Sequence, residues 1–198
     1  FGMAAVAASG AGLNGVAALI GAAIGYIISC GLAGSIRYLA AIVLVYTISF
    51  AFQDTKLASK SVFAPATAAV SALSTGILSS FTSVFTQAPA AAVVLIETVF
   101  SFGGCWFFRE AMSGRERTTE SEELRYAGSV LITAAVLLMA VSQIEIFGAI
   151  SLGRLVAVLI VMTCTLRCGI MTGCTIGTAF GIAMDLTAGG MPFYTMAY

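Results

Sequence analysis

The chain has 198 residues, of which 60% are hydrophobic and only 9% are charged, and its mean hydropathy is +1.04. A soluble domain carries roughly a quarter of charged residues, so this composition excludes an ordinary water-soluble globule. The net charge is zero and there is no basic patch, which excludes the electrostatic surface expected of a nucleic-acid-binding protein. We therefore expect the lipid bilayer to be the main partner of this chain.

Apolar runs near the length needed to cross a bilayer, about 20 residues, follow one another along the chain, separated by short polar or Gly/Pro-containing connections. They predict an all-α, polytopic integral membrane bundle of about eight spanning helices, forming a single transmembrane domain over residues 1–198. Because the first run is short and another begins near residue 191, we expect a fragment of a larger protein with a truncated first helix. The predicted spans are 1–9, 13–31, 36–53, 62–80, 88–109, 124–143, 149–166 and 169–186.

One long polar connection interrupts these runs between Arg109 and Arg125, and it holds nine of the eighteen charged residues of the chain. Thr119 and Glu122 have the spacing of a capping box, which predicts that the next helix begins there. Residues 110–123 are therefore expected to form a polar loop in water. A solvated connection is one interpretation, and a docking surface for a cytosolic partner is the other.

The positions of Lys and Arg predict the orientation of the bundle, because cytoplasmic loops carry the excess of these residues. With the 110–123 loop in the cytoplasm, alternation of the spans puts seven of the nine basic residues on that side. Only Arg37 and Arg154 then lie on the other side. We predict a multi-pass protein of the cell membrane with this loop in the cytoplasm.

Glycines recur every four residues in the last predicted span, and a shorter pair lies in the second. This spacing lines one face of a helix, where a neighbouring helix can approach closely because side chains are missing. We interpret both sets as helix-packing positions; a pore wall or a seam for self-association is the functional alternative. The packing residues are Gly21, Gly25, Gly169, Gly173, Gly177 and Gly181, and Asp185 continues the second series.

Glu97 is the only acidic residue well inside a predicted span, and an intramembrane carboxylate indicates function by default. It could bind a proton or cation in a transporter, pair with Arg154 or Arg167, or bond between helices in its protonated form. No second acidic or histidine residue lies at similar depth to form a relay, so structural pairing is the favoured interpretation. Arg154 and Asp185 are further polar candidates, within the membrane or at its interface.

Catalytic chemistry of its own is not expected in this segment. There is no histidine, and the five cysteines lack the CxxC spacing of a metal site. The two aspartates, Asp54 and Asp185, lie at opposite ends of the chain, whereas a two-metal hydrolase needs several converging carboxylates. No P-loop or G-x-S-x-G sequence is present. We predict no catalytic residue, no cofactor site and no metal site.

The order of several blocks resembles the N-terminal membrane region of the stage II sporulation protein E family. The blocks are FGMAAVAAS at 1–9, GAAIGYIIS at 21–29, and IRYLAAIVLVY immediately downstream. LIETVFSFGGCWFFREA, containing Glu97, and ESEELRYAGSVLITAAVLLMAVSQIEIFGAISLGRL follow, and CGIMTGCTIGTAFGIAMDL is similar to a glycine-stepped helix of that family. The resemblance covers most of the chain.

This resemblance implies a larger protein with about ten helices, a cytoplasmic regulatory region and a PP2C-type serine/threonine phosphatase domain that uses manganese. The segment would be a non-catalytic domain that anchors and localises the phosphatase at the sporulation septum. The implied partners are the tubulin-like division protein and other septal proteins. The alternative function is a small-molecule or ion transporter that uses Glu97 within the membrane.

Overall fold

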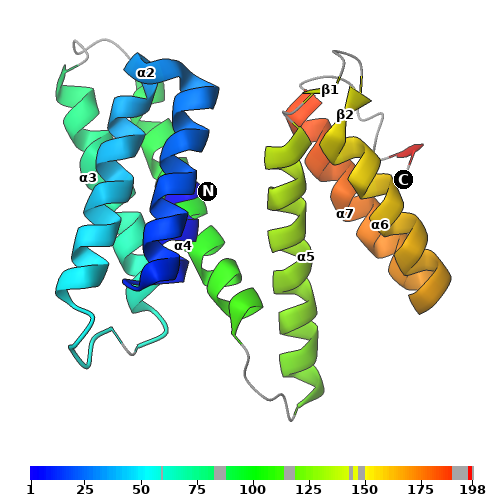
Figure 1. The fold of residues 1–198 in the computed structure, drawn as a ribbon. Coiled ribbons are helices and arrows are strands. Elements are labelled where there is room, and N and C mark those ends of the chain that lie inside the picture. Colours follow the sequence, from blue (N-terminus) through cyan, green and yellow to red (C-terminus); the bar gives the residue numbers. More distant parts are fainter. Residues whose placement is uncertain are drawn as a thin grey trace. The chain divides into compact units, whose positions relative to one another are not determined.

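A computed structural model describes most of the chain, and its fold is helical (Figure 1). The chain divides into two compact units, Phe1–Gly114 and Arg115–Tyr198, which we call unit 1 and unit 2. The described residues are 1–58, 60–82, 88–113, 119–142, 145–146, 150–188 and 196–197.

Unit 1 is a bundle in which a long helical hairpin packs with shorter helices. Gly31 (φ 69°, ψ 170°) breaks the second helix into two arms, residues 13–30 and 32–51. The rings of Tyr26 and Tyr38 stack with their centroids 5.0 Å apart, although twelve residues of straight helix would separate them by about 18 Å. The two arms therefore run back along each other. The helices of unit 1 are α1 (Gly2–Ser9), α2 (Leu13–Ala51), α3 (Phe63–Thr82) and α4 (Ala88–Met112).

The helices of unit 1 run up and down, so their connections gather at two ends (Figure 1). The Gly31 turn lies at one end, and the 52–62 segment lies at the other, together with the last turn of α4. Arg109 Nη1 donates hydrogen bonds to the backbone carbonyls of Lys60 (3.2 Å) and Ser61 (3.4 Å). This contact places the 52–62 segment and the start of the polar loop on the same side of unit 1, as the alternation of spans predicts.

Three helix reversals use a single glycine in nearly the same backbone conformation. Gly10 (φ 73°, ψ −163°) follows α1, Gly31 divides α2, and Gly169 (φ 90°, ψ 168°) follows α6. This combination of positive φ and extended ψ is accessible essentially only to glycine. Each glycine therefore ends one helix and turns the chain without a long loop.

Unit 2 is a three-helix arrangement with a small hairpin between its first two helices. The backbones of Glu145 and Ser151 pair in two-residue antiparallel strands, which the all-α prediction did not include. Next to these strands, Ser151 Oγ donates a hydrogen bond to the Ser142 carbonyl (2.8 Å). The elements are α5 (Glu120–Ser142), β1 (Glu145–Ile146), β2 (Ile150–Ser151), α6 (Leu152–Cys168) and α7 (Ile170–Ala188).

The helices of the described residues follow the predicted runs, once the two arms of α2 are taken separately. The polar loop is shorter than predicted, because α4 continues to Met112 and α5 begins at Glu120; residues 114–118 of that loop lie outside the described part. By length and apolar composition, three described helices could cross a membrane. They are Leu13–Ala51, Ala91–Met112 and Glu120–Ser142, and Ile170–Leu186 is a shorter apolar helix.

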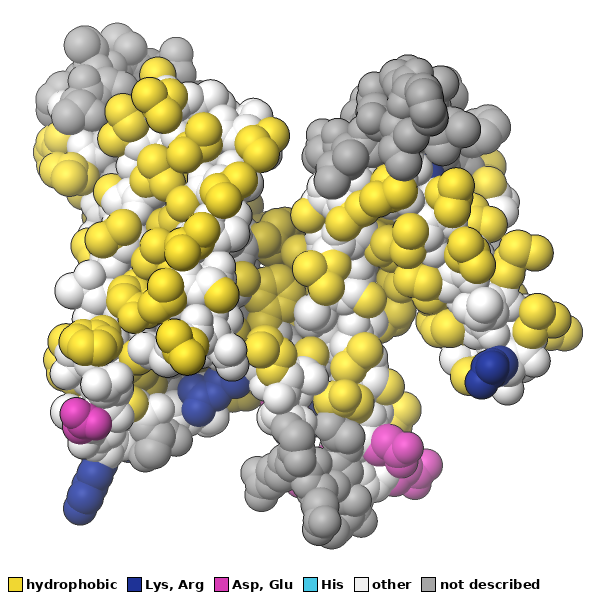
Figure 2. Space-filling view, viewed as in Figure 1, with side chains coloured by type: hydrophobic (Ala, Val, Ile, Leu, Met, Phe, Trp, Pro, Cys, Tyr) yellow, Lys and Arg dark blue, Asp and Glu magenta, His cyan; other side chains and the backbone are white. Residues whose placement is uncertain are grey.

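Large hydrophobic side chains cover the outside of each unit rather than only its core. On the visible face of unit 1 they follow the helices along most of their length, while charged side chains gather toward one end (Figure 2). Examples on α2, α3 and α4 are Ile28, Leu32, Phe81 and Val99, which are 78%, 72%, 70% and 69% exposed. Such a surface is costly in water and favourable in hydrocarbon, so the fold is compatible with a membrane location.

Candidate functional site

The intramembrane candidate Glu97 is held by two residues of the α2 hairpin. Its carboxylate forms an ion pair through Oε2 with Arg37 Nη2. The hydroxyl of Tyr38 donates a hydrogen bond to Oε1 over 3.0 Å. Both charged side chains are largely shielded, with 24% of Arg37 and 23% of Glu97 exposed. Each carboxylate oxygen therefore has a partner.

Aromatic rings extend this site from α4 to the first arm of α2. The Arg37 guanidinium carbon lies 5.3 Å from the centroid of the Tyr38 ring, a cation–π distance. Tyr38 in turn stacks on Tyr26, with an angle of 10° between the ring planes. We call Tyr26, Arg37, Tyr38 and Glu97 the Glu97 cluster.

The Gly31 turn assembles this cluster. Tyr26 precedes the turn and Tyr38 follows it, so reversal of the chain brings the two rings together. At the beginning of α1, Gly2 lies directly against Tyr26: a Cβ added there would be 2.7 Å from the Tyr26 ring. Three helical segments, namely α1 and the two arms of α2, therefore meet at the cluster beside α4.

The sequence interpretation named the wrong partner for Glu97. It offered Arg154 or Arg167, but both belong to unit 2, and the structure pairs Glu97 with Arg37. Arg37 is predicted on the non-cytoplasmic side, at the start of the span 36–53, and is not among the partners expected for Glu97. Its position inside an otherwise apolar run, like that of Glu97, was the available signal.

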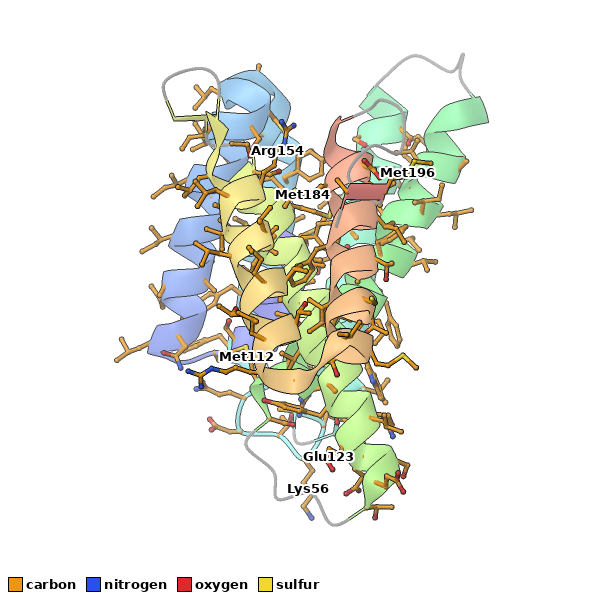
Figure 3. All side chains as sticks on the ribbon, turned by 90° about the vertical axis from the view of Figure 1, so that its right-hand side faces the viewer. Lys56, Met112, Glu123, Arg154, Met184 and Met196 are labelled. Atoms are coloured by element: carbon orange, nitrogen blue, oxygen red, sulfur yellow. The ribbon has the colours of Figure 1, made fainter. Side chains whose placement is uncertain are left out.

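Arg154 and Asp185 are both half-buried in unit 2. Arg154 lies in the first turns of α6, and Asp185 follows Met184 near the end of α7. Figure 3 places Arg154 and Met184 toward one end of this unit and Glu123 of α5 toward the other. Both polar residues have interaction partners, so neither is a free charge within its unit.

The structure divides the predicted packing glycines into two groups. Gly173, Gly177 and Gly181 are buried along one face of α7, and a Cβ on Gly173 would collide with Thr165 of α6. Gly169 does not continue this face, because its positive φ ends α6 before α7 begins. Gly169 has the four-residue spacing of the series, but its role is to end α6 at the reversal.

Gly21 and Gly25, in the first arm of α2, do not mediate packing within unit 1. A Cβ on either residue would meet no atom within 4 Å, and both positions are exposed. Spacing on a helix identifies a common face, but it does not identify the direction in which that face points. The prediction of helix packing at these two positions is wrong for contacts inside the unit.

Two other glycines make close helix contacts that the sequence reasoning missed. A Cβ on Gly153 of α6 would be 2.6 Å from the backbone nitrogen of Ser142 in α5. A Cβ on Gly76 of α3 would be 2.9 Å from Cγ2 of Val94 in α4. Neither glycine belongs to a series of glycines, but each lies four residues from a small residue, Ala72 or Ala157, that is itself buried. Small residues at this spacing are the signal that could have revealed them.

The Glu97 cluster has the chemistry of a structural site. Its carboxylate is engaged by a fixed cation and a hydroxyl. Across the described ranges, no three His, Cys, Asp or Glu side chains group to hold a metal ion. No protein-family model, curated protein or solved structure matches the chain.

Proposed function

We propose that this chain is a non-catalytic membrane domain that anchors and localises a PP2C-type serine/threonine phosphatase of the stage II sporulation protein E kind. The observation that supports it best is the combination of an apolar outer surface with an intramembrane carboxylate that is already paired. Such a domain offers the bilayer a compatible surface, and the carboxylate of Glu97 is already engaged by side chains of its own unit.

In this proposal the eight helical segments, counting both arms of α2, all lie in the membrane. The arms 13–30 and 32–51 are each about 27–30 Å long at 1.5 Å per residue, close to the roughly 30 Å hydrocarbon core. The 52–62 segment and the 110–123 loop face the cytoplasm, where Lys and Arg are favoured. The phosphatase domain and its manganese ions belong to the part of the protein outside this segment.

The family resemblance supports the septal part of the proposal. By that resemblance the protein acts at the sporulation septum of a bacterial cell and associates with the tubulin-like division protein.

Self-association through glycine faces also stays a proposal. In unit 2 the series Gly173, Gly177 and Gly181 is already buried within the unit, which leaves the exposed Gly21 and Gly25 of unit 1 as the available face.

A transporter using Glu97 is the alternative, and the ion pair weighs against it. A carboxylate that binds a transported proton or cation must be able to exchange its partner. Here both oxygens contact side chains of α2. We therefore propose that Glu97 stabilises the bundle.

The test uses the full-length protein in native membranes. We expect a membrane fraction that resists alkaline carbonate extraction and shows manganese-dependent dephosphorylation of a phosphoserine peptide. Glu97→Gln should leave the chemistry of the phosphatase intact, since the carboxylate is remote from it. Absence of phosphatase activity from the full-length protein would refute the proposal, and uptake into proteoliposomes that Glu97→Gln abolishes would establish the transporter instead.

A further inference from the structure

Among the described residues, helices α2 and α4 lack extensive direct packing in unit 1. Helix α1 packs against both of them, and α3 also packs against both. The ion pair of Arg37 with Glu97 and the hydrogen bond from Tyr38 nevertheless join α2 to α4 directly. These side chains therefore make a connection that the helix packing does not make.

Apolar packing alone selects the position of a helix weakly in a bilayer. Lipid chains are as apolar as leucine, so helices are not driven together by the hydrophobic effect, and association depends on close packing and polar contacts. Near Glu97, α4 exposes Val93, Ile96 and Phe100, which are 49%, 56% and 61% exposed, whereas Val94 and Ser101, one turn before and after Glu97, are buried. Rotation of α4 would take Val94 and Ser101 out of their buried positions, and it would also separate Glu97 from its cation.

The cost of separating Glu97 from Arg37 favours the rotation of α4 that keeps the two residues paired. An unpaired charge within the hydrocarbon is strongly unfavourable, and breaking a shielded ion pair leaves two of them. Arg37 is also fixed on its own side, because its guanidinium lies over Tyr38 and that ring stacks on Tyr26. Residues of both arms of the hairpin therefore hold the Arg37 guanidinium in position.

We propose that the Glu97 cluster is an interhelical latch that selects the rotation and depth of α4 relative to the α2 hairpin. The latch directly joins two helices that otherwise share α1 and α3 as packing neighbours. This inference requires only that the helices lie in a bilayer or detergent, and it is independent of any phosphatase activity. Its failure and the failure of the proposed function are therefore distinguishable.

Cys105 provides a reporter for the latch. It lies on α4, two turns beyond Glu97, and its side chain is completely buried in unit 1. Maleimide can modify this thiol only when the helices around it open. Its labelling rate in the full-length protein in mild detergent, read by peptide mass spectrometry, thus reports the opening of unit 1. Cys164, which is half-buried in unit 2, serves as the internal reference.

We expect Arg37→Glu and Glu97→Arg each to raise the Cys105 labelling rate by about tenfold or more, as expected for loss of a coupled pair. The double variant, in which both charges are exchanged, should return most of the way to the wild-type rate. Arg167→Glu makes the same change of charge at an exposed site in unit 2, and it should leave Cys105 unaffected. A double variant that labels as fast as the product of the two single effects would overturn the latch.

Milder variants decide the question if charge reversal prevents folding. Glu97→Gln keeps the shape and an acceptor oxygen but removes the charge, and Tyr38→Phe removes only the hydroxyl that donates to Oε1. We expect each to accelerate Cys105 labelling by roughly three- to tenfold, with no change at Cys164. Labelling of both variants at the wild-type rate would show that the cluster does not hold α4.

Discussion

The replacement Gly153→Ala is expected to force α5 and α6 apart in unit 2. The new Cβ would lie 2.6 Å from the backbone nitrogen of Ser142 and 2.7 Å from both the Leu138 carbonyl oxygen and Ser142 Cα. Favourable contacts between carbon atoms begin at about 3.5 Å, so the helices must separate by roughly 1 Å. The clashing atoms belong to the backbone, so no side-chain rotation relieves them.

Overpacking of this kind costs about 1–3 kcal/mol. Alanine gains little helix propensity at this position because Gly153 lies in the first turn of α6. A loss of 1–3 kcal/mol corresponds to an increase of about 5- to 150-fold in the opening equilibrium. Amide hydrogen exchange of peptides from α5 and α6, measured in detergent micelles by mass spectrometry, should accelerate by this factor.

The matched control is Gly25→Ala, in the first arm of α2. A Cβ there meets no atom within 4 Å, and alanine is favoured over glycine inside a helix by about 0.8–1.0 kcal/mol. Exchange in this arm should therefore slow by a few fold. Wild-type exchange rates in α5 and α6 of Gly153→Ala would refute the assignment of Gly153 as a backbone contact point.

Two further predictions concern a turn and an end of unit 1. Gly31→Ala should destabilise the α2 hairpin by about 1–3 kcal/mol, because alanine is strained at φ 69° and ψ 170°; a lower thermal midpoint than that of the helical control Gly34→Ala would demonstrate it, and equal midpoints would contradict it. Arg109→Gln should loosen the 52–62 segment by about 0.5–1.5 kcal/mol, since the bonds to the carbonyls of Lys60 and Ser61 are lost. Trypsin should then cleave after Lys60 several-fold faster than in the control Arg125→Gln, and unchanged cleavage would show that Arg109 does not restrain the segment.

Much of the local structure could be predicted from the sequence alone. Apolar runs of defined length predicted the helices, and the two arms of α2 correspond to the separate spans expected at 13–31 and 36–53. The beginning of α5 at Glu120, directly after Thr119, also follows from local capping preferences. These features depend on residues close together in the chain, which a linear pattern records.

The contacts between helices required the tertiary structure. Gly21 and Gly25 share one face of α2, and Gly173 and Gly177 share one face of α7. Only the face of α7 is buried within its unit. Likewise, the spacing of Gly153 and Ala157 marks a common face of α6, but only the structure shows that a Cβ on Gly153 would meet the backbone of α5. Periodicity gives the face of a helix, whereas the neighbour of that face depends on how distant segments fold together.

Glu97 shows, for a single residue, which feature local sequence predicts and which feature requires the tertiary structure. From its place within an apolar run, Glu97 could be predicted to need a partner, because a buried charge is costly. The local sequence does not indicate which of several arginines supplies this partner. That choice was made when Gly31 reversed the α2 helix and brought Arg37 and Tyr38 beside α4, a long-range arrangement that local sequence patterns do not encode.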